Sequence, residues 1–201
     1  MVRVLVDNIK QYAKDNRVPI MQDGGIEFII KYIKEHDVKS VLEIGSAIGY
    51  SAIMFASVND DITVTTIERD DNMYEKAIQN ICDCHLDNRI SVIHGDALEV
   101  DIVGKYDLIF IDAAKSQYIK FFEKYKDNLN DDGAIISDNL AFHGLVEDDT
   151  KIMSRNTRQL VKKIRKYIDF LKNNTEFETE FINVGDGVSV SKRVQKTCNN
   201  D

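Results

Sequence analysis

The chain has 201 residues, of which 43% are apolar and 30% charged, a balance typical of one folded domain of ordinary size. This composition excludes a disordered or collagen-like chain, and no apolar run is long enough to span a membrane. The net charge of −8 argues against a nucleic-acid partner held by overall positive charge.

Helix-period and strand-like segments alternate along the chain, which is typical of an α/β fold with a mostly parallel sheet. The pattern predicts helices at 1–16 and 22–36, a strand at 39–44, a helix at 50–58, a strand at 62–67, a helix at 71–84, strands at 90–94 and 107–111, a helix at 116–128, a strand at 133–137, a helix at 154–173 and strands at 177–183 and 187–192. Gly185 and Gly187 suit a hairpin turn between the last two strands.

No repeat or linker divides the sequence, so we predict one domain over residues 1–201. Its parts are N-terminal helices (1–36), a core (37–193) and a tail (194–201). Three sparse cysteines do not suggest a disulfide framework, and charges interrupt the apolar runs of the first 16 residues, unlike a secretory signal. We therefore expect a cytoplasmic protein.

Ligands of open parallel sheets bind beyond the carboxyl ends of the strands, so the residues that follow each strand carry the functional information. Gly45 and Gly49 follow the first strand and allow a turn close to a ligand. Glu68 follows the second strand, 23 residues beyond Gly45, where an acidic side chain can accept hydrogen bonds from ribose hydroxyls. Asp96 follows the third strand, where it could accept from an adenine amine or cap a helix. The set favours a nucleoside ligand.

Oxygen-bearing side chains follow the fourth and fifth strands of the predicted sheet. Asp112 follows one strand, and Asp138 and Asn139 follow the next. Carboxylate and amide oxygens suit Mg²⁺ or Ca²⁺ better than a soft metal. The alternative is that Asp138 and Asn139 are ordinary turn residues.

These strand-end segments, in this order, resemble the class I S-adenosylmethionine (SAM)-dependent methyltransferases. Among these, the chain is similar to the divalent-metal-dependent O-methyltransferase family that includes the catechol and caffeoyl-CoA enzymes. The resemblance is carried by 41–51 (VLEIGSAIGYS), 66–70 (TIERD), 94–99 (HGDALE), 106–118 (YDLIFIDAAKSQY), 134–139 (AIISDN) and 184–193 (VGDGVSVSKR). It implies a Rossmann-like, seven-stranded, mostly parallel sheet with a C-terminal antiparallel hairpin and helices on both faces.

The resemblance also implies a role for each site residue. The residues implied to bind SAM are Met21, Glu43, Gly45 and Ser51 at the methionine end, Glu68 at the ribose, Asp96 and Ala97 at the adenine, and Asp112. The implied ligands of Mg²⁺, or of another divalent cation, are Asp112, Asp138 and Asn139. Lys115 matches a lysine near the substrate hydroxyl, so the implied catalytic residues are Lys115 and Asp112.

Within the family, segments 17–22, 111–125 and 137–146 resemble the bacterial enzymes that convert 5-hydroxyuridine at the tRNA wobble position to 5-methoxyuridine. Residues 151–168 contain seven Lys or Arg and no acidic residue, whereas the rest of the chain has 19 basic and 34 acidic residues. On a helix, one face would carry Arg155, Arg158, Lys162 and Lys166. We expect this face to contact the tRNA anticodon region through phosphates. The resemblance also implies a homodimer.

Other functions fit parts of the same pattern. A small catechol-like or phenolic substrate could bind the same metal, and the basic face could simply be solvated. A non-catalytic SAM- or RNA-binding subunit would have lost the metal ligands, which are present. A nucleotide-binding oxidoreductase needs a tighter glycine motif than this one and does not explain Asp112 with Asp138 and Asn139.

Overall fold

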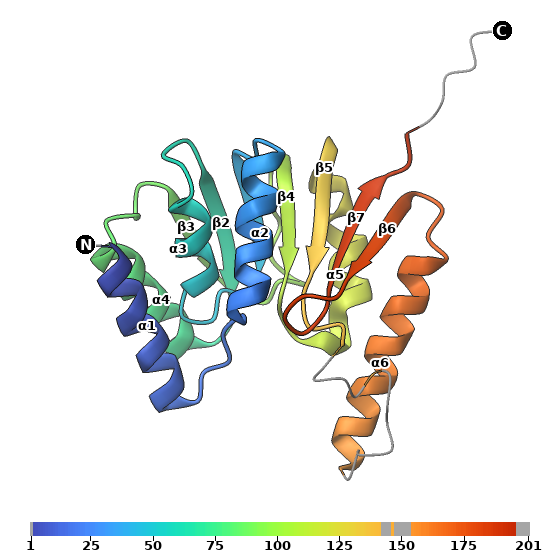
Figure 1. Cartoon of the computed structure of the whole chain (residues 1–201), viewed down its shortest axis with the longest axis horizontal. Helices are drawn as coiled ribbons and strands as arrows, with labels where there is room; N and C mark the ends of the chain where they lie inside the picture. The colour runs from blue at the N-terminus through green and yellow to red at the C-terminus, as the bar shows by residue number, and fades with distance from the viewer. Residues whose placement is uncertain (1, 142–145, 147–153, 196–201) are drawn as a thin grey trace, which may run out of the picture.

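The computed structural model describes residues 2–141, 146 and 154–195, and its single sheet confirms the predicted α/β class (Figure 1). The strands are β1 (Ser40–Ile44), β2 (Thr63–Glu68), β3 (Ile90–His94), β4 (Tyr106–Ile111), β5 (Leu129–Ser137), β6 (Phe177–Ile182) and β7 (Val188–Arg193). Their order across the sheet is β3-β2-β1-β4-β5-β7-β6. The pairs from β3 to β5 are parallel, and β7 runs antiparallel to both β5 and β6, as predicted for a C-terminal hairpin.

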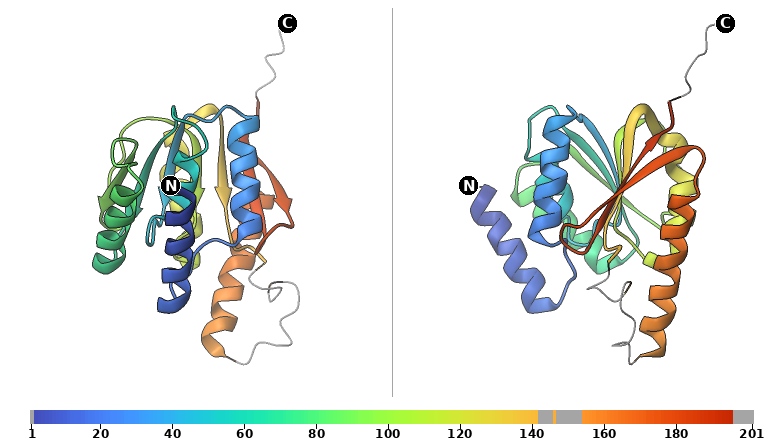
Figure 2. Two further views of the ribbon diagram at one scale, coloured as in Figure 1. Left: turned by 60° about the vertical axis from the view of Figure 1, so that its left-hand side comes forward. Right: turned by 45° about the vertical axis from the view of Figure 1, so that its right-hand side comes forward.

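Helices cover both faces of this sheet (Figures 1 and 2). They are α1 (Val2–Asn16), α2 (Asp23–Glu35), α3 (Tyr50–Ala56), α4 (Asp71–Asp83), α5 (Tyr118–Tyr125) and α6 (Arg155–Lys172), with 3₁₀ turns η1 (Lys115–Gln117) and η2 (Lys126–Asn128). Within the described part of the chain, no helix combines the length and apolar character needed to cross a bilayer. Residues 151–153 of the basic segment and 196–201 of the predicted tail lie outside the described residues.

The central strands are buried on both faces, because successive side chains of a strand point to opposite sides. Along β4, Leu108 and Phe110 join the apolar cluster beneath α1–α4, whereas Ile109 and Ile111 join the cluster beneath α5 and α6. All four are 0% exposed. This two-sided burial explains why a continuous apolar run predicted the strand.

The start of β5 differs from the prediction, because the strand begins at Leu129 instead of residue 133. The polar run 130–133 (NDDG) is typical of a turn, yet the structure extends it. Buried Leu129 pairs with Tyr106, and the Asn130 amide donates to Asp107 Oδ1 at 2.7 Å. A shift in the β4–β5 register between Tyr106 and Leu108 accommodates this earlier start.

The turn after β1 lies against the end of β4, and Gly45 makes this approach possible. Gly45 has a φ of +98°, and a Cβ added to it would lie 2.5 Å from the Asp112 carbonyl oxygen. Its N–H donates to the Ile67 carbonyl at 3.0 Å, and the Asp112 N–H donates to the Ile44 carbonyl at 3.1 Å. These contacts fix the ends of β1, β2 and β4 together.

Gly45→Ala is expected to destabilise the protein more than Gly104→Ala does. Both glycines have positive φ, but a Cβ on Gly104 would meet nothing within 4 Å. Gly104→Ala therefore measures backbone strain alone, about 1–2 kcal/mol, and Gly45→Ala adds the clash with the Asp112 carbonyl, for a total of about 3 kcal/mol or more. Free energies of unfolding in denaturant test this order, and equal losses would contradict it.

Candidate active site

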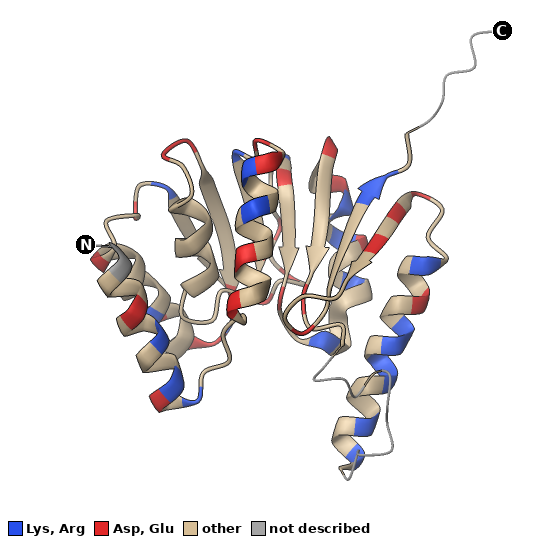
Figure 3. Cartoon of the chain, in the orientation of Figure 1, with Lys and Arg blue, Asp and Glu red and all other residues tan. Residues whose placement is uncertain are grey.

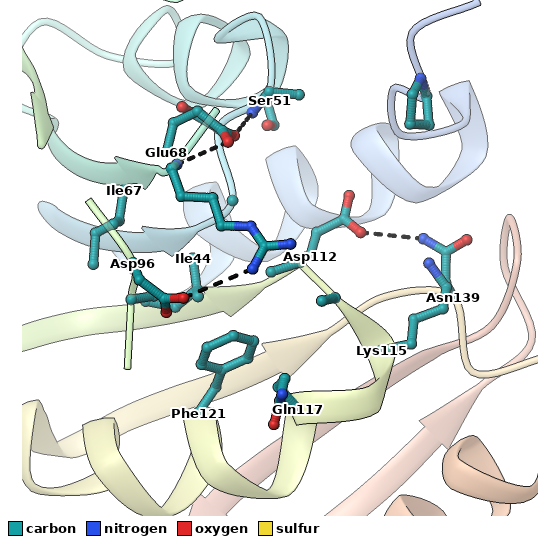
Figure 4. Close-up of a pocket in the computed structure, with 18 of the residues that line it drawn as sticks. Ile44, Ser51, Ile67, Glu68, Asp96, Asp112, Lys115, Gln117, Phe121 and Asn139 are labelled. Atoms are coloured by element: carbon teal, nitrogen blue, oxygen red, sulfur yellow. Dashed lines mark hydrogen bonds and ion pairs between the residues drawn. The ribbon is translucent and has the colours of Figure 1, made fainter. Parts of the chain in front are cut away.

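The carboxyl ends of β1–β4 and the residues after β5 surround a cavity of about 350 Å³ (Figure 4). Most of the residues predicted for the site line it: Met21, Gly45, Ser51, Glu68, Asp96, Ala97, Asp112, Lys115 and Asn139. Glu43 and Asp138 are not among the lining residues. Segments far apart in sequence thus meet here because parallel strands end at one edge of the sheet.

Glu68 has a carboxylate that is held by the backbone around it. Oε2 accepts the Ala47 N–H at 2.8 Å, and Oε1 accepts the N–H groups of Arg69 and Asp70 at 2.8 and 2.9 Å. These three donors fix the carboxylate at the cavity wall and leave Oε2 able to accept a further hydrogen bond. Its geometry therefore suits a ligand hydroxyl.

The Asp96 side chain lies beside Glu68, at the end of β3. Its Oδ1 accepts the Leu98 N–H at 2.8 Å, and its Oδ2 lies 3.7 Å from Arg69 Nη1. Ala97 is 8% exposed and forms part of the same wall. A flat ring system would meet apolar atoms here and find one carboxylate oxygen at the rim.

The loop between α1 and α2 contributes Pro19, Ile20 and Met21 to the cavity wall. Ser51, in the first turn of α3, also lines the cavity. The prediction that Glu43 lines the cavity differs from the structure, because its side chain is 0% exposed and points beneath Ser51. Glu43 therefore contacts the site through the Ser51 hydroxyl.

Glu43 is a buried carboxyl group that joins three elements. It accepts hydrogen bonds from the hydroxyls of Ser51 on α3 and Thr66 on β2, the latter at 2.5 Å. Burial raises its pKa from 4.5 to about 7, and the two hydroxyls oppose this rise. The charged form is thus costly in the folded protein, although both oxygens are hydrogen-bonded.

Asp112, Asp138 and Asn139 come together as predicted. The Asn139 amide donates to Asp112 Oδ1 at 3.3 Å and to Asp138 Oδ2 at 2.9 Å. Asp138 Oδ1 is buried without a hydrogen-bond partner among the described residues. Burial, and then the charge of Asp112, raise the pKa of Asp138 to about 7, and burial raises that of Asp112.

This arrangement fits a divalent cation. Two carboxylates that repel each other, an unpaired buried oxygen and an adjacent amide form a hard-oxygen donor set, which a cation would neutralise. Asn139 also adopts a left-handed φ of +64°, a conformation that asparagine tolerates better than most residues. Among the described residues no group of three or more His, Cys, Asp or Glu side chains could hold a metal ion, and Asn139 lies beside the two carboxylates.

Lys115 begins η1 and lies half-buried at the cavity wall, near Asp112 and Asn139 (Figure 4). Its positive charge opposes the upward pKa shifts of both Asp112 and Asp138. It is therefore close to both carboxylates, where a metal-contacting substrate would enter.

Sequence reasoning missed several residues of the wall: Pro19, Ile20, Arg69, Gln117 and Phe121. Arg69 follows Glu68 directly, so the strand-end rule that selected Glu68 could have included it. Phe121 lies on the apolar stripe of α5 and is 4% exposed, so its pattern predicts only core packing.

Glu43→Gln is expected to change how stability depends on pH. As pH rises from 4.5 to about 7, the unfolded chain loses the Glu43 proton first, so wild-type stability falls across this window. At about 1.4 kcal/mol per pH unit, the loss is about 3 kcal/mol and is absent in Glu43→Gln. Unfolding free energies at several pH values measure the difference. Glu75→Gln, at an exposed position of α4, is the control, and a pH-independent difference for Glu43→Gln would contradict the expectation.

Comparison with known proteins agrees with this geometry. The family model described as O-methyltransferase matches residues 3–194. The caffeoyl-CoA O-methyltransferase of Stellaria longipes is 27% identical over 181 residues, which cover 84% of this chain and 73% of the relative. A Staphylococcus aureus structure with the provisional name caffeoyl-CoA O-methyltransferase is 42% identical, with a TM-score of 0.89 and coverage of 94% and 92% of the two chains.

A methyltransferase of Podospora anserina was solved with S-adenosylhomocysteine (SAH) bound and shares the fold, with a TM-score of 0.86 at 21% identity and coverage of 95% and 88% of the two chains. The family match extends over nearly all of this chain, including every segment that forms the cavity. The protein therefore belongs to the O-methyltransferase family and is a methyltransferase.

Proposed function

We propose that this enzyme methylates 5-hydroxyuridine at the wobble position of tRNA to 5-methoxyuridine, in a reaction that depends on Mg²⁺. The observation that carries the RNA substrate is the basic surface of α6. The N-terminal half of this helix extends beyond the carboxyl edge of the sheet, the edge that holds the cavity (Figures 1 and 2). Lys and Arg residues occur along its length, on a chain that is otherwise acidic (Figure 3).

The two faces of α6 have different roles. Val161, Ile164, Tyr167 and Leu171 are buried against the sheet. The basic face, which we define as Arg155, Arg158, Lys162 and Lys166, is exposed. Arg165 is not part of it, because its guanidinium donates to the Val146 carbonyl at 2.8 and 3.0 Å.

The position and charge of the basic face support an RNA partner. Phosphate groups provide most of the affinity of a protein for RNA, and exposed Lys and Arg bind them. Because the body of the protein is acidic, RNA would be held at this rim and repelled elsewhere. A wobble base lies in an unpaired loop, so it can turn outward into a cavity.

The site residues provide the chemistry of such a reaction. Glu68 and Asp96 would bind the ribose and adenine of SAM, and Asp112, Asp138 and Asn139 would bind Mg²⁺. A bound divalent cation lowers the pKa of an enol-like hydroxyl and orients it. In its neutral form, Lys115 Nζ would take the hydroxyl proton as the oxygen forms its bond to the methyl carbon and the bond from sulfur to that carbon breaks, leaving SAH.

A second candidate is methylation of a small catechol-like phenol. The family relatives named as caffeoyl-CoA O-methyltransferases favour it. A catechol offers two adjacent oxygens to a metal, as do the hydroxyl and carbonyl of 5-hydroxyuridine. The metal site therefore serves either substrate, and the basic face distinguishes them.

Asp138→Asn is expected to reduce methyl transfer by about 100-fold or more, because it removes one charge from the metal ligands. SAH affinity should stay close to that of the wild type, since Asp138 does not line the cavity. Labelled methyl transfer and calorimetric titrations with Mn²⁺ and SAH test this. Asp132→Asn, at an exposed position of β5, is the control. Wild-type activity that persists in chelator would overturn the metal assignment.

Reversing charge on the basic face should weaken binding of the tRNA substrate but not binding of a small phenolic substrate. The double variant Arg155→Glu/Lys162→Glu is expected to raise the KM for 5-hydroxyuridine tRNA by about 10-fold and to reduce the slope of binding against salt by about 2. Turnover of a catechol, if present, should not change. Lys163→Glu alters an exposed lysine of α6 outside the basic face and should have little effect. Equal effects of Lys163→Glu, or label in catechols alone, would exclude the tRNA proposal.

A further inference from the structure

Arg69 is a lining residue of the cavity that neither the metal chemistry nor the substrate explains. It follows Glu68 at the end of β2, and its N–H donates to Glu68 Oε1 at 2.8 Å. The carboxylate that would bind the ribose thus fixes the Arg69 backbone beside the adenosine end of the cavity. Arg69 and Glu68 therefore keep a constant separation at this wall.

The Arg69 side chain extends from β2 toward the end of β3. Its Nη1 lies 3.7 Å from Asp96 Oδ2, the ion pair drawn in Figure 4. The other oxygen of Asp96 is occupied by the Leu98 N–H. Arg69 is consequently positioned at the Asp96 oxygen that accepts no backbone N–H among the described residues.

The ion pair between Arg69 and Asp96 is too weak to explain by itself why the Arg69 side chain lies at this wall of the cavity. The Arg69 and Asp96 side chains are 69% and 38% exposed, and exposed pairs contribute between 0 and about 1 kcal/mol. The guanidinium can therefore leave Asp96 at little cost. Charge attraction to the cofactor does not explain it either, because SAM carries a net positive charge through its sulfonium and ammonium groups.

The planar shape of the guanidinium does offer an explanation. Across this end of the cavity the wall is apolar, formed by Ile67, Ala97, Leu98 and Phe121. An adenine ring placed here would have one face on these apolar atoms and the other toward solvent. Guanidinium groups stack on aromatic faces and are less strongly hydrated than ammonium groups.

We infer that Arg69 covers the adenine ring of the bound cofactor, stacking its guanidinium on the outer face while Asp96 Oδ2 accepts from the exocyclic amine. Arg69 then exchanges a solvated ion pair for a contact with the ring. The inference rests on SAM binding and on neither the metal nor the RNA substrate. It makes Arg69 a residue that determines cofactor affinity.

Calorimetric binding of SAH and of 5′-methylthioadenosine, without metal or RNA, tests this role. Arg69→Ala should weaken both ligands by about 3- to 20-fold. The equal loss for 5′-methylthioadenosine, which lacks the amino-acid part, locates the effect at the adenosine end. Arg69→Lys should recover less than about a third of the lost binding free energy, because an ammonium has no plane to stack.

Lys34→Ala, an exposed position on α2 away from the cavity, is the control and should leave both affinities unchanged. Unchanged or tighter binding by Arg69→Ala would mean that the arginine only occupies Asp96, and full recovery by Arg69→Lys would mean that charge alone matters. Either result overturns the inference. Because neither tRNA nor Mg²⁺ is present, failure of the proposed function would leave this result unaffected.

Discussion

The close approach between the turn after β1 and the end of β4 is the constraint on which the site depends. Gly45 has no room for a side chain because a Cβ would lie only 2.5 Å from the Asp112 carbonyl oxygen. This contact places the cofactor turn directly beside a metal-ligand candidate. A methyl donor and the oxygen that receives the methyl group must lie in line within a few ångströms, and the two adjacent strands provide that proximity.

Buried carboxylates are a second shared feature of this edge of the sheet. Glu43 and Asp138 both have a pKa raised to about 7 by burial, but their surroundings differ. Both oxygens of Glu43 have hydroxyl donors, so it can join β1, β2 and α3 as a structural group. Asp138 keeps an oxygen without a partner among the described residues, which is the feature expected of a group that awaits a cation. The pKa shifts of Glu43 and Asp138 are therefore similar, and their hydrogen bonds are what differ. Glu43 is fully paired, as a structural group would be, whereas Asp138 keeps an oxygen that a cation could bind.

Much of the fold and of the candidate site could be predicted from the sequence. The same physical reasons explain where the structure differs from the prediction. Apolar runs such as 108–111 indicate strands because both faces of β4 are covered, and the rule that ligands bind at strand ends selects Glu68 and Asp112. Glu43 shows the limit of this rule. Alternation along β1 points the Glu43 side chain into the protein interior. Only the hydrogen bond from Ser51 in the structure shows how Glu43 is connected to the cavity. The 130–133 run (NDDG) is misleading because a side-chain hydrogen bond to Asp107 holds the chain extended.

Charge is distributed unevenly over the protein, with carboxylates in the cavity and a row of Lys and Arg on the basic face of α6. The cavity carries carboxylates suited to a cationic cofactor and a cation, and these features require only a small acidic site. The basic face of α6 contributes nothing to that chemistry, since its residues are exposed and lie outside the cavity wall. Its helix is held instead by the apolar face that includes Val161 and Ile164, which would stabilise the fold equally well with neutral residues on the outside. A row of positive charge that neither folding nor methyl transfer requires, on a helix that extends past the edge of the sheet that holds the cavity, is therefore the observation on which our proposal of a polyanionic substrate rests.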